Sequence, residues 1–378
     1  MWKILAAGTA AVLALGAGLS AHGQSATADK RLNDLLNPIR MKHDVPALGC
    51  AIVTGQGLEA LGAVGVRKKG TDVPATVADE WHLGSNTKAM TAAMIGALVE
   101  RNTLKWETTI GEVFPAAASS LDPAFKKVTL LHLLSHRAGL PANIPWGLIP
   151  RKGTPRDQRL AVIKMLSSLK LVAEPGAKYL YSNLGYVVAG AMAEKAADDS
   201  WENLMKKLIF DPLGMAGAGF GGVGTPGLLD QPWPHGEDGK PVEQNGPDVD
   251  NPPVLGPAGT VHCPLADWAR FVADELRGAR GEKALLKPET YKKLQTPPFG
   301  GEYAMGWLVV EREWGGGTVL SHNGSNTMNF AVVWIAPLRD FAVLVVCNEG
   351  APVAFKACDE AASKLIALHL GKPEVKIP

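Results

Sequence analysis

The chain has 378 residues with 46% hydrophobic content, which is ample material for a large core and favours two lobes over one. Its 38 basic and 37 acidic residues nearly cancel, so the sequence lacks the basic surface that binding to nucleic acid requires. Its four cysteines are too few and too scattered for a disulfide scaffold. Although export would permit bridges, we expect buried free thiols at Cys50, Cys263, Cys347 and Cys358.

The N-terminus has the pattern of a secretory signal peptide. Lys3 precedes an apolar run over residues 4–19, and small residues surround a cleavage site after Gly23. We therefore predict a signal peptide over residues 1–23, a mature domain over 24–378, and a periplasmic or secreted location. The apolar run is short and interrupted by glycine, so we expect no stable membrane span after cleavage.

The next segments predict a helix, two strands and a second helix. Leucines at helical spacing indicate a helix over 29–43, and two short β-forming runs over 47–54 and 58–66 meet at a glycine turn. From Ser85 to about residue 101, small and helix-forming residues predict a buried helix. Ser85 and Lys88 share one face of that helix. A serine beside a buried, neutral lysine is a candidate nucleophile, and the helix N-terminus favours an oxyanion there.

The Ser-x-x-Lys spacing is weak by itself, because about one such pair is expected by chance at ordinary composition. A second pair occurs at Ser167 and Lys170, at the end of an amphipathic helix predicted over 157–170, where we expect the lysine to be solvated. For Ser85 the structural alternative is a helix N-cap.

Residues 102–257 predict a mainly helical lobe. Helical patterns interrupted by prolines continue to about residue 211, and a glycine- and proline-rich loop follows over 214–259. Within this loop Trp233 and His235 are candidates either for lining a pocket or for packing. Residues 219–224 match the glycine spacing of a dinucleotide fingerprint, but no strand precedes them and Pro226 prevents a helix directly afterwards, so we expect no such site.

The C-terminal part predicts a helix over 264–277, strands over 303–311, 318–322, 329–335 and 341–348, and a last helix over 353–369. Strands near both ends imply an α+β fold, in which an antiparallel sheet is flanked by helices and carries an inserted all-helical lobe. We place the α/β lobe at 24–101 and 258–378, and the helical lobe at 102–257.

Two further motifs follow Ser85 and Lys88 along the chain. Tyr181-Ser182-Asn183 precedes a predicted helix, and His322-Asn323-Gly324 closes a predicted strand. With these motifs in this order, the chain resembles the serine β-lactamase and penicillin-binding-protein superfamily. It is most similar to the class C-like branch, which includes D-alanyl-D-alanine carboxypeptidases and esterases. The resemblance extends over about residues 30–370, and the flanking phrases at 133–141 and 257–259 agree with it.

The resemblance implies a β-lactamase/transpeptidase-like fold and an acyl-enzyme mechanism on an amide or ester, with a small-molecule or peptide substrate and no cofactor or metal. Ser85 would be the nucleophile, and Lys88 and Tyr181 would share its proton. Asn183 would hold a substrate carbonyl or Lys88. The edge formed by His322, Asn323, Gly324 and Ser325 would bind substrate, with the backbone N–H groups of Ser85 and Ser325 as the oxyanion hole.

One departure and several alternatives bear on the substrate. Many β-lactamases have Lys-Thr-Gly where this chain has His322-Asn323-Gly324, and a largely neutral histidine supplies no constant cation for a substrate carboxylate. A class C-like β-lactamase and a slow or inactive penicillin- or peptidoglycan-binding protein remain alternatives. His82-Leu83-Gly84 precedes the nucleophile and matches no family position.

Other hydrolase classes have less support. No serine lies in the Gly-x-Ser-x-Gly elbow of an α/β-hydrolase. His132 and His136 have the spacing of a zinc site, but Leu133 stands where a zinc peptidase has its glutamate, and no third ligand is signalled nearby.

Overall fold

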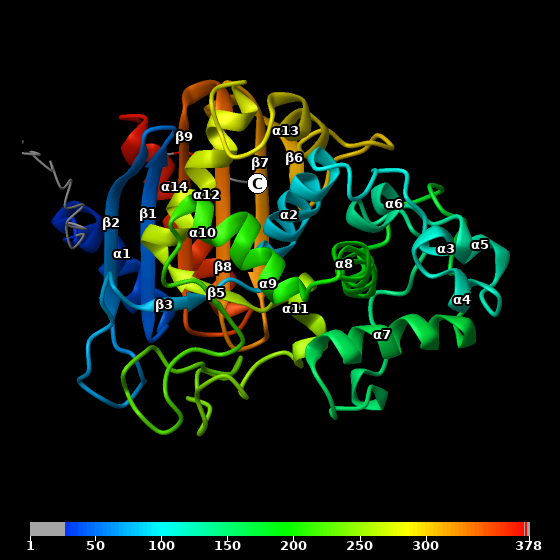
Figure 1. Ribbon diagram of the computed structural model, residues 1–378. Coiled ribbons are helices and arrows are strands. Elements are labelled where there is room, and N and C mark those ends of the chain that lie inside the picture. The colour runs from blue at the N-terminus through cyan, green and yellow to red at the C-terminus, as the bar shows by residue number, and fades with distance from the viewer. Residues whose placement is uncertain (1–26, 374, 376–378) are drawn as a thin grey trace, which may run out of the picture.

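The computed structural model describes residues 27–373 and 375 (Figure 1). The predicted signal peptide lies outside the described residues. The frame is an antiparallel sheet in the order β2-β1-β9-β8-β7-β6. Its strands are β1 (Ala47–Thr54), β2 (Gly57–Gly65), β6 (Leu308–Arg312), β7 (Gly317–Ser325), β8 (Phe330–Ala336) and β9 (Phe341–Cys347). Leu48 lies opposite Cys347, so N-terminal and C-terminal strands pair as predicted.

Alternate side chains of the central strands enter two separate cores, because successive residues of a strand point to opposite faces. On β8, Phe330, Val332 and Trp334 enter the core under α1 (Lys30–His43) and α14 (Val353–His369). Their neighbours Ala331, Val333 and Ile335 enter the core shared with α2 (Thr87–Glu100) and α12 (Leu265–Ala279). In Figure 1, α2 and α12 cross the sheet on this second face.

Of the helices between α2 and β4, the earlier ones lie beside the main sheet, whereas the last two overlap the sheet in the view of Figure 1. The helices of this segment are α3 (Ile110–Val113), α4 (Pro115–Ala118), α5 (Pro123–Lys126), α6 (Leu130–Leu134), α7 (Pro155–Met165), α8 (Asn183–Ala197), α9 (Trp201–Met205) and α10 (Asp211–Leu213). α8 is buried over most of its length and joins the core that contains α2. This arrangement confirms the predicted α+β fold class, whereas the lobe boundaries at 102 and 257 stay a prediction.

Several elements differ from the predicted ones. A second sheet, in the order β3-β5-β4, was missed because β3 (Glu80–His82), β4 (Gly219–Phe220) and β5 (Val261–Pro264) are too short to show a pattern. The short helices α11 (Gly256–Gly259) and α13 (Pro288–Leu294) were also missed. The strand predicted from Tyr303 begins at Leu308, since Gly306 has φ of 86° and turns the chain against Ala89. Conversely, β7 continues beyond His322 to Ser325.

The four cysteines were expected to be buried free thiols. All four cysteines are buried and free, as predicted. Among the described residues, no helix combines the length and apolar character that crossing a bilayer requires.

Candidate active site

A tight turn between β3 and α2 places Ser85 beside β7. Gly84 has φ of 51°, and a Cβ atom there would lie 2.3 Å from the backbone nitrogen of Ser325, so only glycine fits this approach. Ser85 belongs to a short 3₁₀ turn over Gly84–Asn86, and α2 begins at Thr87. No side chain caps the start of α2, so Ser85 does not serve as its N-cap.

Lys88 is fully buried, and its ammonium nitrogen lies within hydrogen-bonding distance of three oxygens. Nζ lies 3.0 Å from Ser85 Oγ, 2.8 Å from Asn183 Oδ1 and 2.6 Å from the Ala258 carbonyl oxygen. No carboxylate is among these partners. Burial lowers the pKa of Lys88 well below its usual value, because desolvation disfavours the charged amine.

Tyr181 and Asn183 reach the same point from the start of α8. Between them, Ser182 caps that helix by accepting a hydrogen bond from Gly185 N–H. The Tyr181 hydroxyl donates to Ser85 Oγ at 2.8 Å, and burial raises the pKa of this phenol above its usual value. Asn183 Nδ2 donates to Asn143 Oδ1 at 3.0 Å, which directs its carbonyl oxygen to Lys88.

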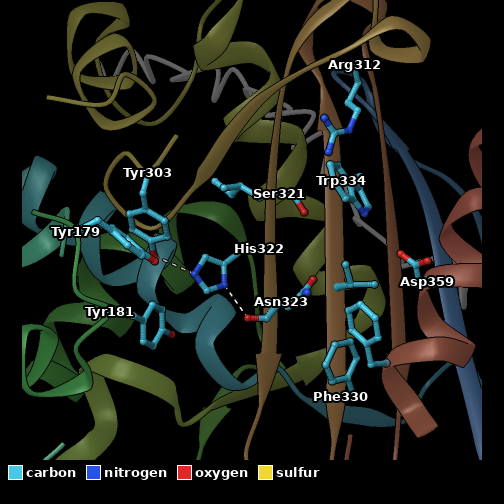
Figure 2. Close-up of a pocket in the computed structure, with 13 residues that line it drawn as sticks. Tyr179, Tyr181, Tyr303, Arg312, Ser321, His322, Asn323, Phe330, Trp334 and Asp359 are labelled. Carbon is cyan, nitrogen blue, oxygen red and sulfur yellow. Dashed lines mark hydrogen bonds between the residues drawn. The ribbon is translucent and has the colours of Figure 1, made fainter. Parts of the chain in front are cut away.

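The last residues of β7, 322–325, form the wall of the site opposite Lys88 and Tyr181. A Cβ atom at Gly324 would lie 1.9 Å from the Leu83 carbonyl oxygen and 2.8 Å from Ser85 N, so this glycine lets strand and turn touch. The backbone nitrogens of Ser85 and Ser325 therefore both lie at this close approach of turn and strand. His322 points to the Ser85 face with its pairing partner Val333, while Asn323 alternates to the other face with Val332 (Figure 2).

A cavity of about 600 Å³ runs along this edge (Figure 2). On the Ser85 side it is lined by Tyr179, Tyr181, Tyr303 and His322. The rest of the lining is mixed and consists of Leu308, Arg312, Ser321, Asn323, Phe330, Val332, Trp334, Phe355 and Asp359. The cavity is therefore aromatic beside Ser85 and carries charged side chains, Arg312 and Asp359, farther away.

The His322 side chain is neutral and makes two hydrogen bonds. Its Nδ1 lies 2.7 Å from the Asn323 carbonyl oxygen, which can only accept, so Nδ1 carries the proton. Nε2 then accepts from the Tyr303 hydroxyl at 2.9 Å. Burial, followed by the charge of Lys88, lowers the pKa of His322 to about 3. The His322 side chain therefore supplies no permanent positive charge to a substrate carboxylate, as the sequence predicted.

Sequence reasoning missed Tyr303 and considered His136 only as a zinc ligand. The buried ring of His136 lies 4.3 Å from that of Tyr181 and 4.7 Å from that of Tyr303. Its Nδ1 accepts from Ser182 N–H at 3.1 Å, which holds the turn that carries Tyr181. The phrase at 133–141 pointed to this segment, but nothing in it indicated that His136 would hold the turn before α8.

The other candidates lie apart from this site. Ser167 is exposed in a 3₁₀ turn and donates to the Lys164 carbonyl oxygen. The His235 ring makes hydrogen bonds to the Asn348 carbonyl oxygen and the Lys69 backbone N–H, and the Trp233 indole N–H donates to the Leu228 carbonyl oxygen. These bonds hold both side chains against neighbouring backbone, which favours a packing role.

The two histidines weighed as zinc ligands have separate surroundings. The ring of His132 stacks on Phe299 at 4.9 Å, and that of His136 faces the tyrosines. Within residues 27–373 and 375, no group of three or more His, Cys, Asp and Glu side chains could hold a metal ion.

The chain is similar to known proteins over most of its length. The family model described as Beta-lactamase matches residues 28–367. Penicillin-binding protein 4 of Amycolatopsis lactamdurans is 24% identical over 335 residues, which cover 84% of each chain. The D-alanyl-D-alanine-carboxypeptidase/endopeptidase AmpH of Escherichia coli is 22% identical, and the match covers 88% of this chain and 87% of AmpH.

Solved structures show the same fold. The octameric penicillin-binding protein homologue from Pyrococcus abyssi superposes with a TM-score of 0.72 at 24% identity, covering 90% of this chain and 77% of that one. The D-alanine carboxypeptidase AmpC from Burkholderia cenocepacia gives a TM-score of 0.69 at 20% identity, with 88% and 98% covered. The family match spans most of the chain, and the chain therefore belongs to the Beta-lactamase family of serine hydrolases.

Proposed function

We propose that this protein is an exported serine hydrolase that forms a covalent acyl-enzyme on Ser85 and hydrolyses an amide or ester. A D-alanyl-D-alanine carboxypeptidase-like or esterase-like activity has the best support. The observation that carries the proposal is the position of Ser85 Oγ, between Lys88 Nζ at 3.0 Å and the Tyr181 hydroxyl at 2.8 Å. A serine with a base and an acid at these distances is equipped for nucleophilic catalysis.

The contacts of Lys88 set the direction of proton transfer. A neutral amine has two N–H groups and one lone pair. Asn183 Oδ1 and Ala258 O can only accept, so they take both N–H groups and leave the lone pair toward Ser85. Ser85 then gives its proton to Lys88 as Oγ attacks the acyl carbon. Tyr181 remains protonated and is placed to pass a proton to the leaving group.

The tetrahedral intermediate needs donors for its oxyanion. The backbone N–H groups of Ser85 and Ser325 are brought together by the close approach at Gly84 and Gly324, and we assign them this role. After the leaving group departs, water attacks the acyl-enzyme by the reverse proton route, with Lys88 and Tyr181 exchanging roles.

The substrate-binding edge supplies no permanent positive charge at His322. His322 is neutral, and we assign His322, Gly324, Ser325 and Asn183 to substrate binding. The Asn323 side chain points to the opposite sheet face, so its part would be played by its backbone. A neutral His322 argues against efficient β-lactam hydrolysis. The Ser85, Lys88 and Tyr181 contacts argue against a protein that binds penicillin or peptidoglycan without acylation, because such a protein has no use for a proton route.

Parallel assays would test the proposal. The purified protein is given a short-chain nitrophenyl ester, a peptide ending in D-Ala-D-Ala and a chromogenic β-lactam. We expect turnover of the ester or the peptide, slow turnover of the β-lactam, and no effect of a chelator. Efficient hydrolysis of the β-lactam alone would favour the class C-like β-lactamase, and loss of activity to the chelator would contradict the mechanism.

A further inference from the structure

Asp250, in the glycine- and proline-rich loop, links the two segments that carry the proposed oxyanion donors. Its Oδ2 lies 2.9 Å from His82 Nε2, and its Oδ1 accepts from Asn326 Nδ2 at 2.8 Å. The side chains of His82 and Asp250 are 1% and 0% exposed. His82 in turn accepts the backbone N–H of Gly84 on Nδ1 at 3.1 Å. Gly84 precedes Ser85 and Asn326 follows Ser325, so one carboxylate joins both walls.

The hydrogen-bond pattern requires a carboxylate in the middle. Because His82 Nδ1 accepts from Gly84 N–H, its proton lies on Nε2, and His82 is a donor toward Asp250. Asn326 is also held as a donor, since its Oδ1 accepts the backbone N–H groups of Met328 and Asn329. Asp250 therefore receives two donors on two oxygens, which an amide of the same shape cannot do.

We infer that Asp250 is a positioning residue, which acts through His82 and Asn326 to fix the spacing between the Ser85 and Ser325 N–H groups. The inference rests on the proposed function, because it assigns a purpose to the spacing of those two donors. Burying a carboxylate beside neutral partners costs stability. A buried charge that joins both walls of a candidate oxyanion hole is better explained by positioning than by packing. This role of Asp250 also assigns a function to His82, which matched no position of the family motifs.

The test compares two variants with a matched control. Asp250→Asn keeps the shape but can accept only one of the two donors. His82→Gln keeps a donor toward Asp250 and removes the acceptor for Gly84 N–H, so it serves if Asp250→Asn does not fold. Asp230→Asn is the control, because Asp230 is an exposed residue of the same loop that accepts from Thr225 N–H.

The measurements are kcat, KM and the Kd of a boronic acid, whose tetrahedral adduct with serine places an oxygen in the oxyanion hole. For both test variants we expect kcat to fall by about 10- to 100-fold with KM little changed, since small displacements of catalytic groups have effects of this size. The boronate Kd should rise in proportion to the loss of kcat/KM. Asp230→Asn should behave as wild type.

Three results would overturn the inference. Wild-type kcat and boronate Kd in a folded Asp250→Asn or His82→Gln would show that the spacing does not depend on this link. A rise in KM with unchanged kcat would place Asp250 in substrate binding. A wild type that neither turns over substrate nor binds boronate at Ser85 would remove the proposed function itself, and is distinguished by failing before any variant is compared.

Discussion

At the scale of single residues, the proposed chemistry depends on the partners of Lys88, and among the described residues none of these partners is a carboxylate. An ion pair would keep this lysine protonated, whereas two carbonyl oxygens and a hydroxyl let it lose the proton. The same burial keeps Tyr181 protonated and His322 neutral. One environment thus suits the base, the acid and the uncharged binding edge that we propose.

Replacement of Tyr181 by phenylalanine removes only the hydroxyl that donates to Ser85. We expect kcat to fall on the order of 10²-fold, the usual contribution of a positioned proton donor, with little change in the thermal midpoint. Tyr179→Phe is the control, because Tyr179 lines the same cavity and is 43% exposed. Equal rates for wild type and Tyr181→Phe would make Tyr181 a packing residue.

The pH dependence of kcat/KM should report Lys88. The base is active when unprotonated, so kcat/KM should rise with pH through the lysine pKa and reach its plateau well below the pH at which an ordinary lysine deprotonates. His322, with a pKa of about 3, should not contribute. A rate profile in the wild type and in His322→Gln checks this. An acidic limb that disappears in His322→Gln would assign the titration to His322.

At the scale of elements, short caps and turns hold the site more than long helices do. The start of α8 places Tyr181 and Asn183 on either side of the Ser182 cap. The 3₁₀ turn before α2 and the extension of β7 to Ser325 bring two backbones into contact. Periodicity found the helices and central strands, but such features occupy two to four residues and leave no periodic signal.

Ser182→Ala should therefore affect stability and catalysis together. Loss of an N-cap costs about 1 kcal/mol, and kcat should also fall because Tyr181 and Asn183 lose their fixed turn. Ser200→Ala is a matched control, since Ser200 caps α9 in the same way, by accepting from Asn203 N–H. Urea unfolding and steady-state kinetics give both quantities. An equal effect of the two substitutions on kcat would refute a positioning role for the α8 cap.

At the scale of the whole molecule, the candidate site draws on segments distant in sequence. Ser85 and Lys88 follow β3, Tyr181 and Asn183 begin α8, Ala258 lies in α11, and His322 to Ser325 end β7. Most of these residues could be predicted from the sequence, because three short motifs occur in the order that the family resemblance requires. The roles of Ala258, His136, Tyr303 and Asp250 could not be found this way, because only folding brings their polar atoms to the site.

The antiparallel sheet was predictable from β-forming runs near both ends of the chain. The pairing of β1 with β9 was implied by those runs, and it is confirmed by Leu48 opposite Cys347. The strand predicted to begin at Tyr303 begins later, because Gly306 turns the chain against α2. This contact joins residues far apart in sequence, so it could not be predicted. Sequence patterns therefore reported the layers of this fold better than the ends of its elements.

The most direct test of the central claim is the mass of the acylated protein. After treatment with a slowly hydrolysed acylating inhibitor, intact-mass spectrometry should show one added acyl group, and peptide mapping should place it on Ser85. Ser85→Ala should show no adduct, while Ser167→Ala, with its exposed serine in the second Ser-x-x-Lys pair, should label as wild type does. An adduct on Ser167, or full turnover by Ser85→Ala, would contradict the account.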